Sequence, residues 1–277
     1  MVLKSKYFVI MLHVLLCINF IKAQKPVALN FAHAHNDYEK LFRKDFKKAI
    51  RFGCSSIEID VFPYRGQLKV AHIALFLGLR TNFEKRYLKP LHKIIHTNGN
   101  IFQNPTDKLI LMVDIKRNPQ KAYRLLRSLC EKYEDILTVR YKNSSALRDG
   151  PLQILLSGSK PYDALFADSI RYMQLDGGLG DIGNEKFGPE LVPRVSTSYR
   201  GNFKWRGHGK ISDKELLFLK ETIKRAKEDI RELRFWGMPN NLNVLNFMLR
   251  EGVHWLNIDR LNLLKKLDAA TVKSRGG

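Results

Sequence analysis

The sequence Ser55-Ser56-Ile57-Glu58-Ile59-Asp60-Val61 decides how the rest of the chain is interpreted. Apolar β-branched residues alternate here with polar ones, and this period of two predicts a β-strand. The alternation places Glu58 and Asp60 on the same face of that strand. Two carboxylates so close repel each other, and adjacent carboxylate oxygens are what hard divalent cations bind. An ordinary strand with a polar outer face would show the same pattern, so the rest of the chain has to distinguish the two interpretations.

Strands and helices alternate along the chain, which indicates parallel β/α units. About eight such pairs fit the roughly 250 residues of a closed barrel. The prediction is therefore an α/β chain folded as a single (β/α)8 TIM barrel. A doubly wound open sheet is the alternative, although no Gly-rich phosphate loop follows the first strand. The expected strands are 27–31, 55–61, 67–71, 109–115, 152–156, 172–175, 191–195, 233–236 and 255–258, and the expected helices are 42–52, 87–96, 120–133, 162–166, 213–228, 243–250 and one from Leu261.

The N-terminus has the layout of a secretory signal peptide. Two lysines precede a largely apolar run over 7–21, after which the chain turns polar. We expect cleavage after Ala23, which makes 1–23 the signal peptide and 24–277 a single folded domain. The mature protein would then be secreted or periplasmic. A membrane anchor is the alternative, but the apolar run is short for a bilayer span, which needs about 20 residues.

The chain is strongly basic, with a formal net charge of +21. Such a surface attracts anions such as phosphate esters, acidic lipids or nucleic acid. No zinc-finger or RNA-binding signature accompanies the charge, so no nucleic-acid partner is expected. Once Cys17 leaves with the signal peptide, Cys54 and Cys130 remain. These two can form a disulfide in an oxidising compartment or lie apart as buried thiols.

Polar residues gather where the expected strands end. In a β/α barrel the C-terminal strand ends form the active-site face. Three carboxylates there suit an oxygen-preferring cation such as Ca²⁺ or Mg²⁺, and two histidines suit a general base and a general acid. A lysine suits negative charge that develops on a phosphoryl oxygen. This combination fits metal-assisted cleavage of a phosphodiester. The residues are His33, His35, Glu58, Asp60, His72, Asp114, Lys116, Asp176, Trp236 and Asp259.

Several of these residues have a simpler structural interpretation. His33 fits a core histidine or a supporting residue better than a catalytic one, and Lys116 can simply neutralise Asp114 on the same strand face. Trp236 suits either the core or the wall of a substrate pocket. We expect Asp259 to cap the following helix. Two further histidines, His92 and His96, lie one helical turn apart, which is zinc spacing, but no third ligand is near them in the sequence, so a solvated helix face is expected.

The order and spacing of several motifs resemble the superfamily of glycerophosphodiester phosphodiesterases and phosphatidylinositol-specific phospholipases C. The resemblance covers almost the whole mature chain and is greatest to the secreted bacterial branch. The motifs are His33-Ala34-His35-Asn36-Asp37-Tyr38, Ser56-Ile57-Glu58-Ile59-Asp60-Val61, Val70-Ala71-His72, Val113-Asp114-Ile115-Lys116, Phe203-Lys204-Trp205-Arg206-Gly207, Arg234-Phe235-Trp236 and Asn257-Ile258-Asp259.

The resemblance implies a phosphoric diester hydrolase of lipid metabolism, acting on a glycerophosphodiester or a phospholipid headgroup, with possible peripheral contact to a membrane. The matching residues would be His35 and His72 as the catalytic pair and Glu58, Asp60 and Asp114 as ligands of Ca²⁺ or Mg²⁺, with Asp114 where many members carry Glu. In the mechanism that we expect, Lys116 supports the charge that develops on the phosphoryl group. Asn36 and Trp236 would contact substrate, with Asn36 standing where the phosphodiesterases have Arg.

One position departs from the family in a way that keeps a second function open. Ile73 stands where most members have Asp after the second histidine, and its loss would leave His72 less well oriented. A non-catalytic secreted barrel that binds anionic phosphate or lipid headgroups is therefore the alternative. A metal-dependent barrel hydrolase acting on sugars or amides is another.

Overall fold

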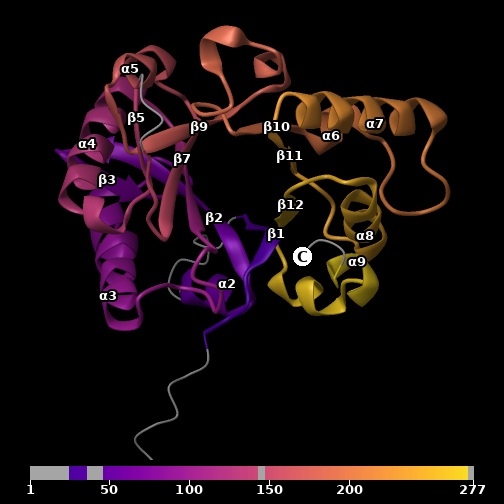
Figure 1. The fold of residues 1–277 in the computed structure, drawn as a ribbon, viewed down its shortest axis with the longest axis horizontal. Helices are drawn as coiled ribbons and strands as arrows, with labels where there is room; N and C mark the ends of the chain where they lie inside the picture. The colour runs from indigo at the N-terminus through magenta and orange to yellow at the C-terminus, as the bar shows by residue number, and fades with distance from the viewer. Residues whose placement is uncertain (1–24, 36–45, 143–146, 274–277) are drawn as a thin grey trace, which may run out of the picture.

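The computed structural model describes residues 25–35, 46–142 and 147–273. Its centre is a nearly closed barrel of parallel strands in the order β11-β10-β9-β7-β4-β2-β1-β12 (Figure 1). This confirms the predicted (β/α)8 barrel. The barrel strands are β1 (Leu29–Ala34), β2 (Cys54–Tyr64), β4 (Leu109–Ile115), β7 (Leu152–Gly158), β9 (Met173–Gly177), β10 (Arg194–Ser198), β11 (Glu232–Trp236) and β12 (Leu256–Ile258).

The two ends of the chain meet in the barrel wall. Strand β1 pairs with β12 in parallel, with His33 opposite Asn257 and Ala34 opposite Ile258. In Figure 1 the first strand, in indigo, accordingly lies beside the last. The seam between β11 and β12 is narrower, with a bridge between Arg234 and Trp255. The barrel is therefore nearly closed, and residues far apart in sequence share one site.

Helices cover the outside of the barrel, with α3 and α4 along one side and α6 to α9 on the other (Figure 1). Helix α7 begins where Ser212 and Glu215 form a capping box. Between β9 and β10 the chain makes only short 3₁₀ turns instead of an α-helix. The helices are α2 (Phe46–Arg51), α3 (Lys89–Asn98), α4 (Pro119–Lys132), α5 (Tyr162–Ala167), α6 (Tyr199–Asn202), α7 (Asp213–Glu228), α8 (Leu242–Glu251) and α9 (Ala269–Lys273).

A hairpin extends the barrel wall at β2. Strand β3 (Gln67–Val70) pairs antiparallel with the end of β2, and the chain turns at Arg65 and Gly66, both with positive φ. Two central residues with positive φ are the signature of a type I′ turn, which matches the twist of a hairpin. The hairpin returns the chain to the level of Asp60 and Val61 in β2 and delivers His72 there.

Smaller elements that the sequence did not reveal complete the fold. Strands β5 (Val139–Tyr141), β6 (Leu147–Arg148) and β8 (Ile170–Arg171) form a separate small sheet. Strands this short carry too few residues for a recognisable alternation. The remaining turns are 3₁₀ or π segments: η1 (Leu77–Leu79), η2 (Glu84–Leu88), η3 (Glu134–Ile136), η4 (Leu179–Asp181), η5 (Glu185–Phe187) and η6 (Leu261–Lys266).

The hydrophobic core has two parts. Most of it lies between the barrel strands and the surrounding helices, and a small cluster inside the barrel consists of Ile110, Met112, Leu155 and Trp255. Cys54 and Cys130 are both buried thiols and are not joined in a disulfide, so the buried-thiol alternative is correct. Burial raises the pKa of the Cys130 thiol far above its usual range, which keeps it unreactive.

Two expected elements differ in detail. The strand expected at 191–195 begins instead at Arg194, because Pro193 has no N–H to donate and precedes the ladder. The segment after Leu261 is a 3₁₀ turn, not an α-helix. The predicted signal peptide at 1–23 lies outside the described residues. Among the residues that are described, no helix has both the length and the apolar character needed to cross a membrane.

Candidate active site

A cavity of roughly 550 Å³ opens at the C-terminal ends of the barrel strands. It brings together seven of the ten residues predicted for the site, which come from β2, β4, β9, β11 and the segments that follow β1, β3 and β4. Asn36 lies outside the described residues. The lining residues are His35, Glu58, His72, Asp114, Lys116, Ser157, Gly158, Lys160, Asp176, Gly177, Gly178, Ser196, Arg234, Trp236 and Gly237.

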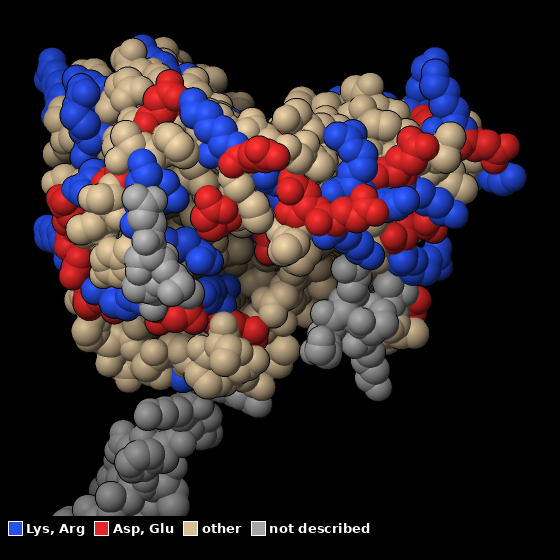
Figure 2. Space-filling model, turned by 45° about the horizontal axis from the view of Figure 1, so that its top comes forward, with Lys and Arg blue, Asp and Glu red and all other residues tan. Residues whose placement is uncertain are grey.

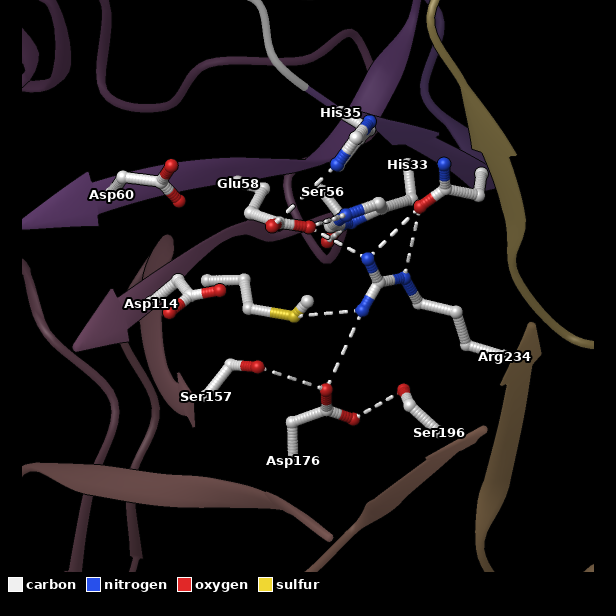
Figure 3. Close-up of polar contacts among 12 residues, drawn as sticks. His33, His35, Ser56, Glu58, Asp60, Asp114, Ser157, Asp176, Ser196 and Arg234 are labelled. Atoms are coloured by element: carbon white, nitrogen blue, oxygen red, sulfur yellow. Dashed lines mark hydrogen bonds and ion pairs between the residues drawn. The ribbon is translucent and has the colours of Figure 1, made fainter. Parts of the chain in front are cut away.

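A buried arginine, Arg234, forms the floor of the cavity (Figure 3). Its Nη2 donates to Glu58 Oε2 at 2.6 Å and to Asn257 Oδ1 at 2.9 Å, and its Nη1 lies 3.4 Å from Asp176 Oδ2. The side chain is only 3% exposed. Because side chains alternate along β11, Arg234 and Trp236 share one face of the strand and both line the cavity. Of the two positions considered for Trp236, the core and the pocket wall, the structure shows the pocket wall.

The arginine fixes the charge of Glu58. Burial alone would raise the pKa of this carboxyl, but the Arg234 guanidinium and the hydrogen bond to His33 hold it well below its usual range. Glu58 is therefore an anion even though it is buried. Its other oxygen, Oε1, is turned toward the cavity and lies 3.8 Å from His35 Nε2.

Asp176 is the second carboxylate on the arginine. It accepts hydrogen bonds from Ser196 Oγ at 2.6 Å and from Ser157 Oγ at 3.4 Å (Figure 3). Burial raises the pKa of Asp176 despite the opposing charges of Arg234 and Arg194. Asp176 thus belongs to the floor network and the cavity wall, and the sequence could not separate these roles from helix capping.

His33 supports the site from within the barrel. It is fully buried, with Nδ1 2.8 Å from Ser56 Oγ and Nε2 3.2 Å from Glu58 Oε2. Burial and the nearby Arg234 charge lower its pKa well below the usual value, so the ring is neutral near pH 7. His33 does not line the cavity, in agreement with its expected supporting role.

His35 is held by the last strand of the barrel. Its Nδ1 lies 2.6 Å from Asp259 Oδ1, and Asp259 Oδ2 accepts a hydrogen bond from Asn240. Burial would lower the pKa of His35, but the Asp259 hydrogen bond and the charges of Glu58 and Asp259 outweigh it and raise the pKa. The expectation that Asp259 caps the following helix is therefore wrong: η6 has no side-chain cap, and Asp259, after β12, contacts the histidine that follows the neighbouring strand β1.

His72 is held by the second strand. Its Nδ1 lies 2.6 Å from Asp60 Oδ2, and its side chain is half exposed at the cavity mouth. The neighbouring Ile73 points to solvent, with 55% of the residue exposed. Ile73 stands where most family members have Asp. In this chain Asp60 supplies a carboxylate that orients His72, so His72 is held in place even with Ile at position 73.

Lys116 sits between two carboxylates of adjacent strands. Its Nζ lies 3.1 Å from Asp60 Oδ1 and 3.2 Å from Asp114 Oδ2. Burial would lower the pKa of Lys116, but these two carboxylates raise it, so it stays a cation. The pKa of Asp114 is raised, first by its own burial and then by the charges of Asp60 and Glu58. Lys116 therefore neutralises both carboxylates, not Asp114 alone.

The carboxylates of Glu58, Asp60 and Asp114 fit a divalent cation. One oxygen from each lies within 4.8 Å of the other two. Asp60 Oδ1 is buried and has no hydrogen bond of ordinary geometry, only the ion pair with Lys116. An all-oxygen set of this kind suits Ca²⁺ or Mg²⁺ better than Zn²⁺.

The sequence did not reveal the roles of two residues with direct contacts to the site, Arg234 and Asp259. Arg234 was noted only as part of a motif, although an arginine alternating with the buried Leu233 and Phe235 already indicates a charge inside the barrel. Asp259 was misassigned because its partner, His35, is 224 residues away. No local pattern reports such a contact.

A comparison with known protein families finds a match. The family model for the AIM6-like phosphodiesterase domain matches residues 21–176 of this chain. The matched range contains His35, His72, Lys116 and the three clustered carboxylates. It ends before the strands that supply Arg234 and Asp259.

Two fungal proteins are similar in sequence. "Altered inheritance of mitochondria protein 6 homolog" of Arthroderma benhamiae is 26% identical over 259 residues, covering 84% of this chain and 82% of that protein. "Altered inheritance of mitochondria protein 6" of Kluyveromyces lactis is 25% identical over 292 residues, covering 83% of this chain and 69% of that protein. These matches give no support to the bacterial branch suggested by the motifs.

Two solved structures share the fold. A calcium-dependent phosphoinositol-specific phospholipase C from Pseudomonas sp. superposes with a TM-score of 0.54 at 14% identity, covering 87% of this chain and 93% of that one. A glycerophosphodiester phosphodiesterase from Parabacteroides distasonis gives 0.52 at 13% identity, covering 92% and 100%. At such identities the likeness establishes the barrel fold alone.

Proposed function

The chain belongs to the AIM6-like phosphodiesterase family, and on that premise we propose that it is a metal-dependent phosphodiester hydrolase. Its substrate would be a glycerophosphodiester or a phospholipid headgroup. His35 and His72 would act as the general acid and base, and Lys116 would support the charge that develops on the phosphoryl group.

The observation that carries this proposal is a pair of histidines on one cavity, each with a carboxylate at Nδ1. Asp259 lies 2.6 Å from Nδ1 of His35, and Asp60 lies 2.6 Å from Nδ1 of His72. A carboxylate at Nδ1 fixes the tautomer and leaves Nε2 as the position that exchanges a proton. One histidine can then take the proton of the attacking hydroxyl, from water or from the substrate's own neighbouring alcohol. The other can give a proton to the leaving oxygen.

The charges of the cavity suit an anionic substrate. Lys116 and Lys160 both line it, and Lys160 Nζ donates to the backbone oxygen of Asp176 at 2.8 Å. Glu58, Asp60 and Asp114 would hold Ca²⁺ or Mg²⁺, which when bound stabilises negative charge on a phosphoryl oxygen. Arg234 is committed to Glu58, Asp176 and Asn257, so its role is to keep the floor in place and not to bind phosphate.

A lipid substrate is supported by an apolar loop beside His72. Four large apolar residues in 73–79 are between 51% and 87% exposed: Ile73, Leu75, Phe76 and Leu79. Such a patch beside the cavity, in a chain of net charge +21, fits peripheral contact with an anionic membrane surface. On the face seen in Figure 2, Asp and Glu interrupt the Lys and Arg, which speaks against a continuous surface for nucleic acid. Secretion after cleavage of 1–23 is proposed on the sequence alone.

The test is hydrolysis of a chromogenic phosphodiester by the purified protein, before and after chelation, with Ca²⁺ or Mg²⁺ added back. We expect activity that the chelator removes and one of the two ions restores. A folded protein with no hydrolysis under either ion, but with binding to anionic lipid vesicles, would instead favour the non-catalytic barrel. Phe76→Ser with Leu79→Ser should lower turnover of vesicle substrate and leave turnover of the soluble diester unchanged.

A further inference from the structure

We propose that His92, His96 and Asp135 form a second metal site, for a borderline transition-metal dication such as Zn²⁺. The site lies apart from the cavity and shares no residue with it. One helical turn separates the two histidines in α3, a spacing that had seemed insufficient for a site because no third ligand was near them in the sequence. The structure provides that ligand.

The histidine pair is arranged for chelation. His92 and His96 are four residues apart, so both side chains leave the same face of α3. Their ring centroids are 4.2 Å apart. The ring of Tyr133 packs edge-on against His92, with the centroids 5.4 Å apart, and limits the orientations of that imidazole. Two imidazoles one turn apart on a helix are a recurring half of a zinc site.

The third ligand comes from another element. Asp135 lies in η3, directly after α4, and its Oδ2 is 3.1 Å from His92 Nε2 and 2.6 Å from His96 Nε2. Both Nε2 atoms therefore converge on one carboxylate oxygen. The three candidate ligand atoms lie within 4.8 Å of one another, a spacing that a small ion can bridge after slight movement of the side chains.

The donor set selects the metal. Two imidazole nitrogens and one carboxylate oxygen favour Zn²⁺ and its transition-metal neighbours over Ca²⁺ and Mg²⁺. The three side chains are between 36% and 57% exposed, so water can supply the fourth ligand of a tetrahedral ion. The chain would thus hold two chemically different metals: a hard cation on the cavity carboxylates and a borderline one here.

The position in the fold indicates a structural role. Asp135 follows the C-terminal end of α4, and in a β/α barrel the helix C-termini lie at the end opposite the active site. A metal held by His92, His96 and Asp135 would fasten α3 to the turn after α4. It would affect the unfolding of the barrel and not the proton transfers in the cavity.

The experiment uses the untagged full chain, stripped of metal and then titrated with ZnCl₂ by calorimetry in excess Mg²⁺ and Ca²⁺. We expect saturable Zn²⁺ binding that these ions do not displace and that raises the melting temperature. His96→Ala and Asp135→Asn should each weaken it by at least about tenfold, since even the loss of outer-shell partners costs about 10–100-fold. Asp114→Asn, in the cavity, is the matched control and should leave it unchanged.

Cobalt gives an independent readout. Co²⁺ at a tetrahedral site with imidazole ligands absorbs visible light far more strongly than octahedral Co²⁺ on oxygen ligands, so strong bands should appear in the parent chain and disappear in His96→Ala. Zinc binding that His96→Ala and Asp135→Asn leave intact but Asp114→Asn removes would overturn the proposal, because the metal would then occupy the cavity. Absence of saturable binding in the parent chain would overturn it equally and leave only a hydrogen-bonded surface cluster.

Discussion

Two places in this molecule combine a pair of histidines with carboxylates, and they are built in opposite ways. In the cavity, His35 and His72 each have a carboxylate of their own, Asp259 and Asp60. On α3, His92 and His96 share a single oxygen of Asp135. In the first arrangement the imidazoles of His35 and His72 line one cavity but contact different carboxylates. In the second the imidazoles of His92 and His96 contact the same carboxylate oxygen.

The contrast shows that arrangement, more than residue type, separates proton transfer from metal binding. When each histidine has its own carboxylate at Nδ1, one tautomer is fixed and Nε2 stays available to exchange a proton with a substrate. Convergence of two Nε2 atoms on one oxygen leaves no room for a substrate between them but suits a small ion. The surroundings differ too, because Glu58 and Arg234 lie buried beneath the cavity whereas the α3 cluster is open to water.

The sharpest test of the contrast removes one histidine from each place. His35→Ala and His72→Ala should each lower kcat/KM for a phosphodiester by roughly 10²–10⁴, the usual value of a general acid or base. His96→Ala should leave kcat/KM within experimental error. Near-normal turnover in either cavity variant would remove these histidines from the mechanism.

The next test concerns charge burial. Arg234→Met leaves Glu58 and Asp176 buried without their counter-charge, which should cost about 3–5 kcal/mol of unfolding free energy. Asp135→Asn weakens two exposed hydrogen bonds, to His92 and His96, and should cost less than about 1 kcal/mol in the absence of metal. Urea unfolding followed by circular dichroism measures both, and equal losses would contradict the distinction between a buried network and an open cluster.

A smaller effect is expected from Asp259→Asn. Asp259 raises the pKa of His35, so its neutralisation should lower that pKa and move the corresponding limb of the pH profile of kcat/KM toward acid. The direction is the same whether His35 acts as acid or base. A limb that stayed in place would mean that His35 does not set it. Asp135→Asn is again the matched control.

The smallest effect should come from Ile73→Asp, which restores the residue that most family members carry. Because Asp60 already holds Nδ1 of His72 and Ile73 is exposed, we expect little change in turnover and a stability change within about 0.5 kcal/mol. A large gain in kcat/KM would show that Asp60 orients His72 poorly. Such a result would revive the interpretation of Ile73 as an inactivating substitution.

Local patterns predicted the part of the site that depends on a single strand. Alternation along β2 placed Glu58 and Asp60 on one face, and the strand ends predicted that Asp114 and Lys116 would join them. The barrel followed from the succession of β/α units. These features could be predicted because they need only the period of a strand and the parallel direction of its neighbours.

The contacts made by barrel closure could not be predicted in this way. The pairing of His35 with Asp259, the counter-charge that Arg234 offers to Glu58 and the approach of Asp135 to His92 each join distant segments. Asp60 was expected only as a metal ligand. Its contact with His72 depends on how the β2–β3 hairpin twists, and the sequence does not specify that twist. The start of β10 was predicted wrongly for a local reason. The apolar pattern predicted a strand from Leu191, but Pro193 has no backbone N–H to donate and the strand begins at Arg194.

The pairing of β1 with β12 has a consequence for synthesis of the protein. The ribosome makes Asp259 224 residues after His35, so a nascent chain can assemble most of the sheet while His35 still lacks its carboxylate. Incomplete chains would thus be unable to hydrolyse phosphodiesters before the barrel closes. In refolding experiments activity should return no earlier than the fluorescence change of Trp255, which lies at the seam, and an earlier return would show that the seam is not required.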